Sequence, residues 1–483
     1  MPSILGANTL SSGYDVANSL RFNDGDSPAL TRSLGTTTLA TKGTFSFWVK
    51  RGQLTTAQII YSNEVADDNN RAFIQFEDDD TFRIKDTVSG SNTTHYATTQ
   101  KFRDVGAWYH MVVALDSTEA GGNRIRVYKN GTRIPDAQFG TSTEPNQNSD
   151  FKLLTGGQTN KNHIGKIHGG ANHFDGYLAE FVYCDGQVLD ASSFGEFDSD
   201  SGIWKPIDVS GLTFGDQGFY LDFEDSSALG NDAAGSNNFG TVTNLAATDQ
   251  STDTCTLNYS TLNFLATSSY NDLSEGGLKV TGNTATNDGE TFSTFVMPNA
   301  TAKWYWELKC TNKQSTGNPK FGFIQAKRGF RLQNGGAGYG GAASGTLDIM
   351  VRPDGKTLEN GSTSGSAVIG TWDTGDILSF ALDSVNGAFY VGINGTWQTS
   401  GDPTSGSSKT GAVKTWTPTD SKCDDGQAVC IGSYNGSVTE ANFGSPSFSI
   451  SSGNTDGNGY GNFEYSVPSG YYSLNTKNLA EYG

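Results

Sequence analysis

Three tyrosines lie in loops rich in glycine and asparagine, where side chains tend to be exposed. They are Tyr339, Tyr434 and Tyr460, and Asn435 and Asn458 lie close to two of them. An aromatic ring offers an apolar face for stacking on a sugar, and amide groups hydrogen-bond to hydroxyls. These five residues are therefore candidates for glycan or partner binding. The alternative is that the tyrosines cap their own domain or pack against a neighbouring subunit.

Paired acidic residues in several loops indicate a second kind of chemistry. Asp24 and Asp26 lie in one loop, Asp67 and Asp68 in another, and residues 78–80 form a third acidic group. Carboxylates are ligands that Ca²⁺ prefers. No run has the Asp-X-Asp-X-Asp-Gly order of an ordered calcium loop, so solvated acidic turns are the alternative. The sequence establishes no cofactor, and calcium is the metal for which it offers the better candidates.

Histidines form a further candidate for metal binding. His163, His168 and His173 are spaced five residues apart, and imidazole is a common metal ligand. On a strand, a spacing of five places neighbouring side chains on opposite faces. Three ligands would meet only if the intervening loop folded back, so we interpret these residues as loop histidines.

The sequence contains no clear catalytic motif. Glycoside hydrolysis needs two carboxylates about 5–10 Å apart, which a Glu-X-Asp-X-X-Glu strand would supply. Neither the acidic run 77–80 nor Glu180 has this spacing. The glycine-rich run 335–341 does not open a helix, as a dinucleotide site requires. We therefore expect no enzyme, with a polysaccharide depolymerase as the minor alternative.

Composition excludes several classes of partner. The chain has 32 Lys and Arg against 51 Asp and Glu, a formal net charge of −19, which disfavours nucleic acid and anionic membranes. No apolar run approaches the roughly 18 residues of a membrane span, and the first residues lack the pattern of a signal peptide. We therefore expect synthesis in a cytosol.

Five cysteines are too few for a disulfide framework, and we expect Cys423 and Cys430 to be free thiols rather than a pair.

Short alternating segments bounded by Gly, Asn and Asp recur along the whole chain and predict an all-β fold. Two of them contain Asn-Gly, at Asn130-Gly131 and at Asn394-Gly395. This pair is the strongest short-range signal for a β-hairpin, because a type I′ turn needs positive φ at both central residues. One such hairpin in each half predicts two tandem β-sandwich domains.

Charge places the boundary between these domains. Residues 198–254 contain ten acids and one base, Lys205. We interpret this segment as an acidic extended connector that lays a strand onto a neighbouring sheet. The expected organisation is an N-terminal arm (1–14), a first jelly roll (15–200), the connector (201–254), a second β-sandwich (255–475) and a C-terminal tail (476–483). The arm and the tail are natural attachment points.

The first domain resembles the laminin G-like or concanavalin A-like jelly roll. The resemblance is carried by five segments, at residues 19–25, 45–50, 108–113, 128–131 and 174–181. It implies that Trp48 and Trp108 are buried in the core between two sheets.

The second domain resembles the SPRY fold, a bent β-sandwich used for partner recognition. The matching segments are 303–309, 321–324, 375–383, 387–395 and 442–444. A glycine-rich insert at residues 335–344 departs from the family pattern where the binding loops would lie.

The tandem as a whole resembles structural proteins of marine tailed phages, including the joining segment 202–206 and the final segment 468–479. This resemblance implies a virion protein on a tail, fibre or capsid. Its partners would be other virion proteins and host cell-surface polysaccharide, and it would be a homo-oligomer, with a trimer as one option. The alternative is a dedicated glycan-binding adhesin. The chain has no heptad or collagen-like repeat for a stalk, which favours a docked module.

Overall fold

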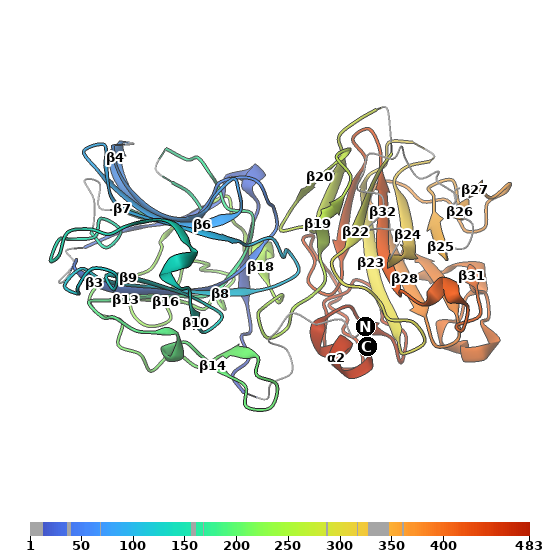
Figure 1. Cartoon of the computed structure of the whole chain (residues 1–483). Coiled ribbons are helices and arrows are strands. Elements are labelled where there is room, and N and C mark those ends of the chain that lie inside the picture. Colours follow the sequence, from blue (N-terminus) through green and yellow to red (C-terminus); the bar gives the residue numbers. More distant parts are fainter. Residues whose placement is uncertain are drawn as a thin grey trace. The chain divides into compact units, whose positions relative to one another are not determined.

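The computed structural model consists of two compact units, Met1–Leu257 and Asn258–Gly483. It describes residues 13–35, 40–67, 69–155, 161–167, 169–285, 288–315, 317–326, 347–359 and 362–483, with the side chains of 64–67 and 421 excepted. Each unit is built from stacked antiparallel sheets, so the tandem β-sandwich architecture is confirmed (Figure 1). None of the described helices is long and apolar enough to cross a membrane.

One sheet of the first unit, called here the inner sheet, has the strand order β10-β9-β8-β3-β13-β1-β18, with β16 also paired to β13. Its strands are β1 (Ser19–Phe22), β3 (Lys42–Arg51), β8 (Tyr109–Asp116), β9 (Ile125–Lys129), β10 (Thr132–Arg133), β13 (Gly176–Asp185), β16 (Phe219–Leu221) and β18 (Gln250–Ser251).

The other sheet, called the outer sheet, has the order β11-β7-β6-β5-β4-β12-β2-β17. Its strands are β2 (Ala29–Ser33), β4 (Gln58–Asp67), β5 (Asn70–Phe76), β6 (Thr81–Val88), β7 (Ser91–Lys101), β11 (Phe139–Thr143), β12 (Lys161–Ile164) and β17 (Thr241–Thr243). A separate two-stranded hairpin consists of β14 (Gly195–Phe197) and β15 (Trp204–Pro206).

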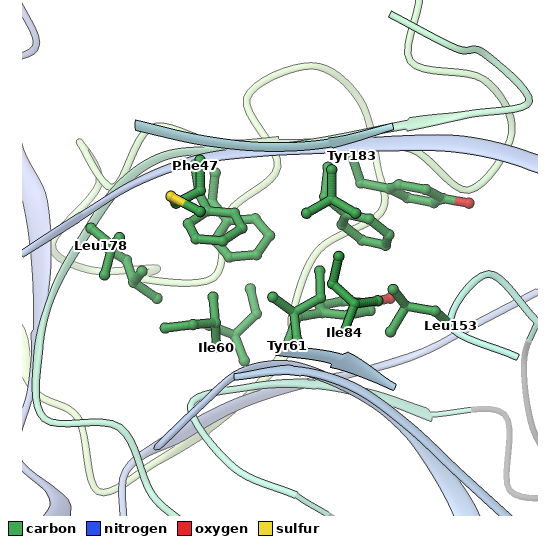
Figure 2. Close-up of a cluster of buried hydrophobic side chains, with 14 of the residues drawn as sticks. Phe47, Ile60, Tyr61, Ile84, Leu153, Leu178 and Tyr183 are labelled. Carbon is green, nitrogen blue, oxygen red and sulfur yellow. The ribbon is translucent and has the colours of Figure 1, made fainter. Parts of the chain in front are cut away.

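Alternation along the strands directs large apolar side chains into the space between these sheets. On β3, Phe45 and Phe47 point into this core and are fully buried. Phe45 stacks on Tyr183 of β13 with ring centroids 4.6 Å apart. Ile60 and Ile84 approach from the outer sheet (Figure 2). The period-two pattern of the sequence therefore builds the core of the first unit.

Trp48 and Trp108 are buried, but not between the two sheets. Trp48 lies between two inward-pointing residues of β3, so its side chain points to the opposite face of the inner sheet. There both tryptophans join Trp204 in a second apolar cluster, built with segments that follow β13. The expectation that they fill the inter-sheet core is wrong, because the inner sheet is covered on both faces.

Residues 201–254, expected to form a connector, lie within the first unit. Strand β15 pairs with β14, β16 with β13, β17 with β2 and β18 with β1. Phe219 and Leu221 of β16 are fully buried in the inter-sheet core. This segment completes the first unit because its apolar residues find strand partners there, while most of its acids stay at the surface.

The second unit also contains two sheets. The β24 sheet has the order β19-β22-β32-β24-β25-β26-β27. Its strands are β19 (Leu262–Thr267), β22 (Gly289–Ser293), β24 (Lys320–Gln325), β25 (Asp348–Val351), β26 (Thr357–Glu359), β27 (Ser362–Thr363) and β32 (Gln427–Ser433). Phe321 and Phe323 of β24 pack against Phe380 and Phe389 of the facing sheet, with centroid distances of 6.4 and 4.9 Å.

That facing β23 sheet has the order β20-β21-β33-β23-β28-β29-β30, with β31 on β29 and β34 parallel to β23. Its strands are β20 (Asn271–Ser274), β21 (Lys279–Gly282), β23 (Lys303–Asn312), β28 (Ile377–Asp383), β29 (Ala388–Ile393), β30 (Thr396–Trp397), β31 (Lys414–Thr415), β33 (Val438–Asn442) and β34 (Tyr472–Ser473).

Helices are short. The described 3₁₀ turns are η1 (Asp24–Asp26), η2 (Asp136–Gln138), η3 (Ala191–Ser193), η4 (Ala247–Asp249), η5 (Gln398–Ser400), η6 (Pro403–Ser408) and η7 (Ser421–Cys423), and α2 (Thr476–Tyr482) ends the chain. The Asn475 side chain accepts a hydrogen bond from the Asn478 amide at 2.8 Å and caps α2. Asn478 is buried and donates to Asp456 at 2.8 Å. The segment expected as a tail is therefore a packed helix of the second unit.

Both Asn-Gly hairpins are confirmed. Asn130 and Gly131 have φ of 45° and 78° between β9 and β10, and Asn394 and Gly395 have 47° and 79° between β29 and β30. These values are those of a type I′ turn, in which both central residues are left-handed.

The five cysteines are buried free thiols, as expected for Cys423 and Cys430.

Candidate functional site

The loop residues chosen from the sequence do not meet in one site. Tyr434 and Asn435 lie in the turn between β32 and β33, where Asn435 is exposed with a φ of 46°. The Tyr434 hydroxyl donates a hydrogen bond to the Ala285 carbonyl. Asn435 remains free to contact a ligand, whereas Tyr434 is partly engaged within its own unit.

Tyr460 and Asn458 lie at the other end of β33. The loop that carries them contacts this end through Asn442, which donates to the Asn462 carbonyl at 2.9 Å. Asn458 donates to the Asn478 side chain at 2.8 Å, and the Lys477 ammonium lies 5.7 Å from the centre of the Tyr460 ring.

These contacts hold the loop against α2. They fit the alternative that the tyrosines cap their own domain. Tyr339, the remaining candidate of this set, lies outside the described residues.

The acidic candidates for calcium are distributed over separate places. Asp24 and Asp26 lie together in η1, where the Asn23 amide donates to Asp26 at 2.7 Å and burial raises the pKa of Asp24. The side chain of Asp67 and all of Asp68 lie outside the described part of the chain. Within that part, no three His, Cys, Asp or Glu side chains gather closely enough to hold a metal ion.

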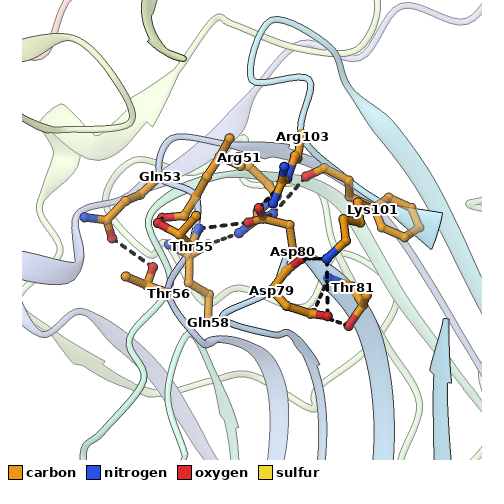
Figure 3. Close-up of polar contacts among 12 residues, drawn as sticks. Arg51, Gln53, Thr55, Thr56, Gln58, Asp79, Asp80, Thr81, Lys101 and Arg103 are labelled. Carbon is orange, nitrogen blue, oxygen red and sulfur yellow. Dashed lines mark hydrogen bonds and ion pairs between the residues drawn. The ribbon is translucent and has the colours of Figure 1, made fainter. Parts of the chain in front are cut away.

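Asp79 and Asp80 of the acidic run 78–80 form a structural junction (Figure 3). Asp80 is fully buried and contacts Arg51 at 3.0 Å and Arg103 at 2.7 Å. Its Oδ1 also accepts a hydrogen bond from the Thr55 amide at 2.8 Å. Asp79 contacts Lys101 at 3.3 Å. These carboxylates neutralise arginine and lysine and thereby fix the turn between β5 and β6.

Two buried glutamates are also engaged within their own units. Glu180 of β13 accepts a hydrogen bond from the Tyr220 hydroxyl at 2.8 Å, and burial raises its pKa to about 8. Glu307 of β23 is fully buried, and burial raises its pKa too. Glu307 accepts from the backbone amides of Glu464 at 3.0 Å and Tyr465 at 2.8 Å, so it anchors the chain segment that covers the β23 sheet.

The second unit contains a hollow of about 310 Å³. It is lined by Leu347, Asp348, Lys414, Thr415, Trp416, Thr417, Asp420, Lys422 and Cys423. Lys414 forms an ion pair with Glu359, and Lys422 lies 3.8 Å from Asp420. The lysines are thus largely neutralised by their own neighbours, and the hollow has no strong preference for one sign of charge.

A different arrangement is found on the outer sheet of the first unit, on the face away from the core. On β6, Arg83 and Lys85 flank the inward-pointing Ile84, so both point outward. Lys85 is in register with Phe73 of β5 on one side and with His95 of β7 on the other. Directly opposed residues have Cβ atoms about 5 Å apart, and residues i and i+2 of one strand lie about 7 Å apart.

Arg71 of β5 completes this group. It precedes Phe73 by two residues and is therefore diagonal to Lys85, at about 7–8 Å. Its guanidinium carbon lies 5.6 Å from the centre of the Phe73 ring. We call Arg71, Arg83, Lys85 and His95 the cationic face. All four side chains are half-buried, and the Nε atoms of Arg71 and Arg83 and the Nε2 atom of His95 are buried from solvent.

The ion pairs of the cationic face are only partly described. Glu77 lies 2.7 Å from Arg83, and Arg71 makes an interaction of its own. Among the described residues, Lys85 and His95 have no ion pair or side-chain hydrogen bond. Burial, followed by the charges of Arg71 and Arg83, lowers the pKa of Lys85. Burial and the charges of Arg83 and Lys85 likewise lower the pKa of His95. The cations therefore repel one another.

The surroundings cover part of this face. The strands of the outer sheet bend so that the face is concave on the side away from the core (Figure 1). On one side Ile167 packs on Ile59 of β4 and Phe73 of β5, and Phe73 is 3% exposed. On the other side Thr141 and Thr143 of β11 continue the row beyond β7. The corresponding face of the inner sheet is covered by the cluster around Trp204.

Sequence reasoning missed these four residues, although a signal for them was present. Arg83 and Lys85 alternate with Phe82 and Ile84, and this period-two pattern is typical of a strand. Basic residues in such strands are unexpected in a chain with a net charge of −19. What the sequence does not give is the register that places them on adjacent strands.

Residues 23–191 match a family model described as the concanavalin A-like lectin/glucanases superfamily. This range includes most of the core of the sandwich and the cationic face. The first unit thus has a laminin G-like, concanavalin A-like lectin fold, as the sequence predicts. No curated protein matches the chain.

Several solved structures are similar to parts of the chain or to most of it. The SPRY domain of human HERC1 is 12% identical with a TM-score of 0.25, over 35% of this chain and 89% of that one. Mouse laminin alpha1 domains LG4-5 are 9% identical with a TM-score of 0.29, over 92% of each chain. Domain 4 of AbnA, a GH43 extracellular arabinanase from Geobacillus stearothermophilus, in complex with arabinotriose, is 20% identical with a TM-score of 0.25, over 38% and 82%.

Proposed function

We propose that this chain is a structural protein displayed on the surface of a phage particle, and that its first unit binds glycans. The observation that carries the glycan part is the concanavalin A-like lectin fold of residues 23–191, in which one concave sheet face is open. The side chains on this face include arginine, lysine, histidine and threonine, beside phenylalanine, glutamine and glutamate. The basic and hydroxyl side chains donate hydrogen bonds to hydroxyl and anionic groups, as recognition of a sugar requires.

The second unit is proposed to bind neighbouring virion proteins and to take part in a homo-oligomer. Its support is the resemblance of the tandem arrangement to virion proteins that pair these two folds. Mass spectrometry of purified particles, with antibody labelling in electron micrographs, tests the location. Absence of the chain from purified particles would refute it, and light scattering of the isolated protein gives the oligomeric state.

The dedicated adhesin remains the main alternative to a structural role. A glycan array and binding to intact host cells, both with the purified chain, separate the two. An adhesin must bind host cells, and soluble protein must reduce phage adsorption by competition. A structural subunit that binds glycans only weakly would leave adsorption unchanged.

We further propose that the chain binds glycan without cleaving it. Glu180 and Glu307 support this, because both are buried and held in hydrogen bonds within their units. A depolymerase would release reducing ends from host polysaccharide. Incubation of the chain with that polysaccharide, followed by a reducing-end assay, tests the point, and release above the heat-inactivated control would contradict it.

A further inference from the structure

We propose that Lys50 and Asp253 react with each other to form an intramolecular amide bond. The bond would join β3 covalently to the segment that follows β18, at the end of the first unit. The observation that points to it is a lysine ammonium and an aspartate carboxylate in contact inside the protein. This modification is made by the chain's own residues and is independent of glycan binding.

The two reacting groups already touch. The Lys50 Nζ lies 2.7 Å from Oδ2 of Asp253, and the two side chains are 0% and 2% exposed. Lys50 points to the covered face of the inner sheet, because it follows Trp48 by two residues on β3. Lys50 and Asp253 each make a further interaction as well. Contact of this kind places a nucleophile beside its target without a search through solution.

Asp253 is held in position by its backbone and by its second carboxylate oxygen. Its amide donates to Ser251 Oγ at 3.1 Å, and Ser19 Oγ donates to its carbonyl at 2.6 Å. The Trp108 indole Nε1 donates to Oδ1 at 3.1 Å. Oδ1 is the oxygen that would gain negative charge when the nitrogen adds to Cγ, and it would become the amide carbonyl. An N–H group already aimed at such an oxygen stabilises the addition step.

Burial makes the lysine a better nucleophile. Burial lowers the pKa of Lys50, while the charges of Asp253 and Asp104 act in the opposite direction. An amine has the free electron pair that an ammonium lacks, so loss of the proton activates the nitrogen. The Tyr177 ring, centred 5.6 Å from Nζ, forms part of the wall of the site. The same exclusion of water would protect the finished amide from hydrolysis.

The reaction balances without any added reagent. One ammonium proton passes to Oδ2, which leaves an amine beside a carboxylic acid. The amine nitrogen attacks Cγ, and the Nζ–Cγ bond forms. The Cγ–Oδ2 bond then breaks as a second proton moves from nitrogen to Oδ2, which departs as water. The third proton stays on the amide nitrogen, and nothing is oxidised or reduced.

A second lysine–aspartate pair provides a comparison within the same chain. The Lys303 Nζ lies 2.9 Å from Oδ2 of Asp383, whose side chain is also fully buried. The Lys303 side chain is 21% exposed, so water reaches it and competes for the ammonium. We therefore expect no amide at this pair. Burial of the lysine, rather than distance alone, selects Lys50.

Intact mass spectrometry of the denatured full chain, under reducing conditions, tests this inference. We expect a mass below that of the sequence by about 18 Da, the mass of one water. A tryptic digest should contain residues 43–51, uncleaved at Lys50 and joined to a peptide that includes Asp253. The linked chain should also migrate faster in a denaturing gel, because the closed loop restricts the unfolded chain.

The decisive variant is Lys50→Arg. Arginine keeps the positive charge in the buried site, but its guanidinium stays protonated and is no nucleophile, so the variant should have its full sequence mass. Lys303→Arg makes the same change at the second pair and should keep the deficit of about 18 Da. Trp108→Phe removes the N–H donor to Oδ1 and should leave at least about tenfold more unlinked chain in freshly prepared protein.

Several results would overturn the inference. A wild-type mass equal to that of the sequence would do so by itself, so the test stands even if Lys50→Arg does not fold. A deficit that persists in Lys50→Arg, or that appears without the linked peptide, would assign the lost water to another site. Complete linkage in Trp108→Phe would contradict the role of its N–H group, and a link between Lys303 and Asp383 would contradict selection by burial.

Discussion

Replacement of Glu180 by glutamine should stabilise the first unit at neutral pH. Glu180 is 5% exposed and accepts hydrogen bonds from the hydroxyls of Tyr220 at 2.8 Å and Tyr14 at 3.3 Å. Burial raises its pKa from 4.5 to about 8. The folded protein therefore holds this carboxyl protonated at pH 7, whereas the unfolded chain has it ionised.

The magnitude follows from this difference in pKa. A pKa raised by folding means that the folded state binds an extra proton between about pH 4.5 and 8, so stability falls as the pH rises through that window. Each pH unit corresponds to about 1.4 kcal/mol, which gives a penalty of about 3 kcal/mol at pH 7. Glutamine has the same size, cannot ionise, and retains one acceptor and two donor hydrogens for the two tyrosines. Glu180→Gln should thus gain about 3 kcal/mol at pH 7 and almost nothing at pH 4.

Urea unfolding at pH 4, 7 and 9 measures this gain. Hydrogen exchange followed by mass spectrometry on peptides of β13 assigns the gain to the first unit. Glu119→Gln, at an exposed position of the same unit, is the matched control and should change stability by less than about 0.5 kcal/mol. A gain that is equal at pH 4 and pH 9, or a loss at every pH, would refute the assignment of a buried protonated carboxyl.

Three further predictions concern the framework of the first unit. Asp80→Asn should lower stability by about 3–5 kcal/mol in urea unfolding, because Arg51 would stay buried without its counter-charge. Asp79→Asn, at an exposed ion pair, is the control and should cost less than about 1 kcal/mol. Similar losses in the two variants would contradict the buried network. Gly131→Ala should destabilise the β9–β10 hairpin in thermal unfolding, since its φ is 78° and a Cβ would lie 2.2 Å from the Trp204 ring, and an unchanged Tm would rule this packing out. Burial lowers the pKa of His110 to about 3, so protonation of this residue in the unfolded chain should reduce the free energy of unfolding as the pH falls below 6.5. His110→Gln should weaken this loss of stability at acid pH in urea unfolding. A loss of the same size in the variant would assign it to other groups.

The sequence predicts the strands and hairpins well because the relevant information is local. Asn130-Gly131 and Asn394-Gly395 each contain the residues that a type I′ turn needs, and no distant contact is required to recognise them. The burial of Phe45 and Phe47 likewise follows from period-two alternation.

Features that depend on long-range pairing are harder to predict. Trp48 is apolar and lies in a strand, so the sequence cannot distinguish a core between two sheets from a second core on the opposite face. The acidic segment 201–254 is a similar case. Its apolar residues predict a strand laid onto a neighbouring sheet, and Phe219 and Leu221 do pair with β13 and enter the core, but its charge suggests a connector between domains rather than part of the first one. Local composition and non-local pairing conflict here, and pairing determines the structure.

The same limit explains why aromatic loop residues were chosen and the cationic face was missed. Tyr434 and Tyr460 are conspicuous in their loops, yet β33 separates them, and each contacts its own unit. Arg71, Arg83 and His95 are unremarkable until the register brings them beside Lys85.

The two faces of the first unit then acquire different roles. The inner sheet is covered on both sides and holds its polar groups, such as His110 and Glu180, in internal hydrogen bonds. The outer sheet has one open face on which cations repel one another. One glutamate at position 85 would relieve that repulsion. Lys85→Glu should therefore raise the Tm of the first unit, and an unchanged or lower Tm would contradict the repulsion.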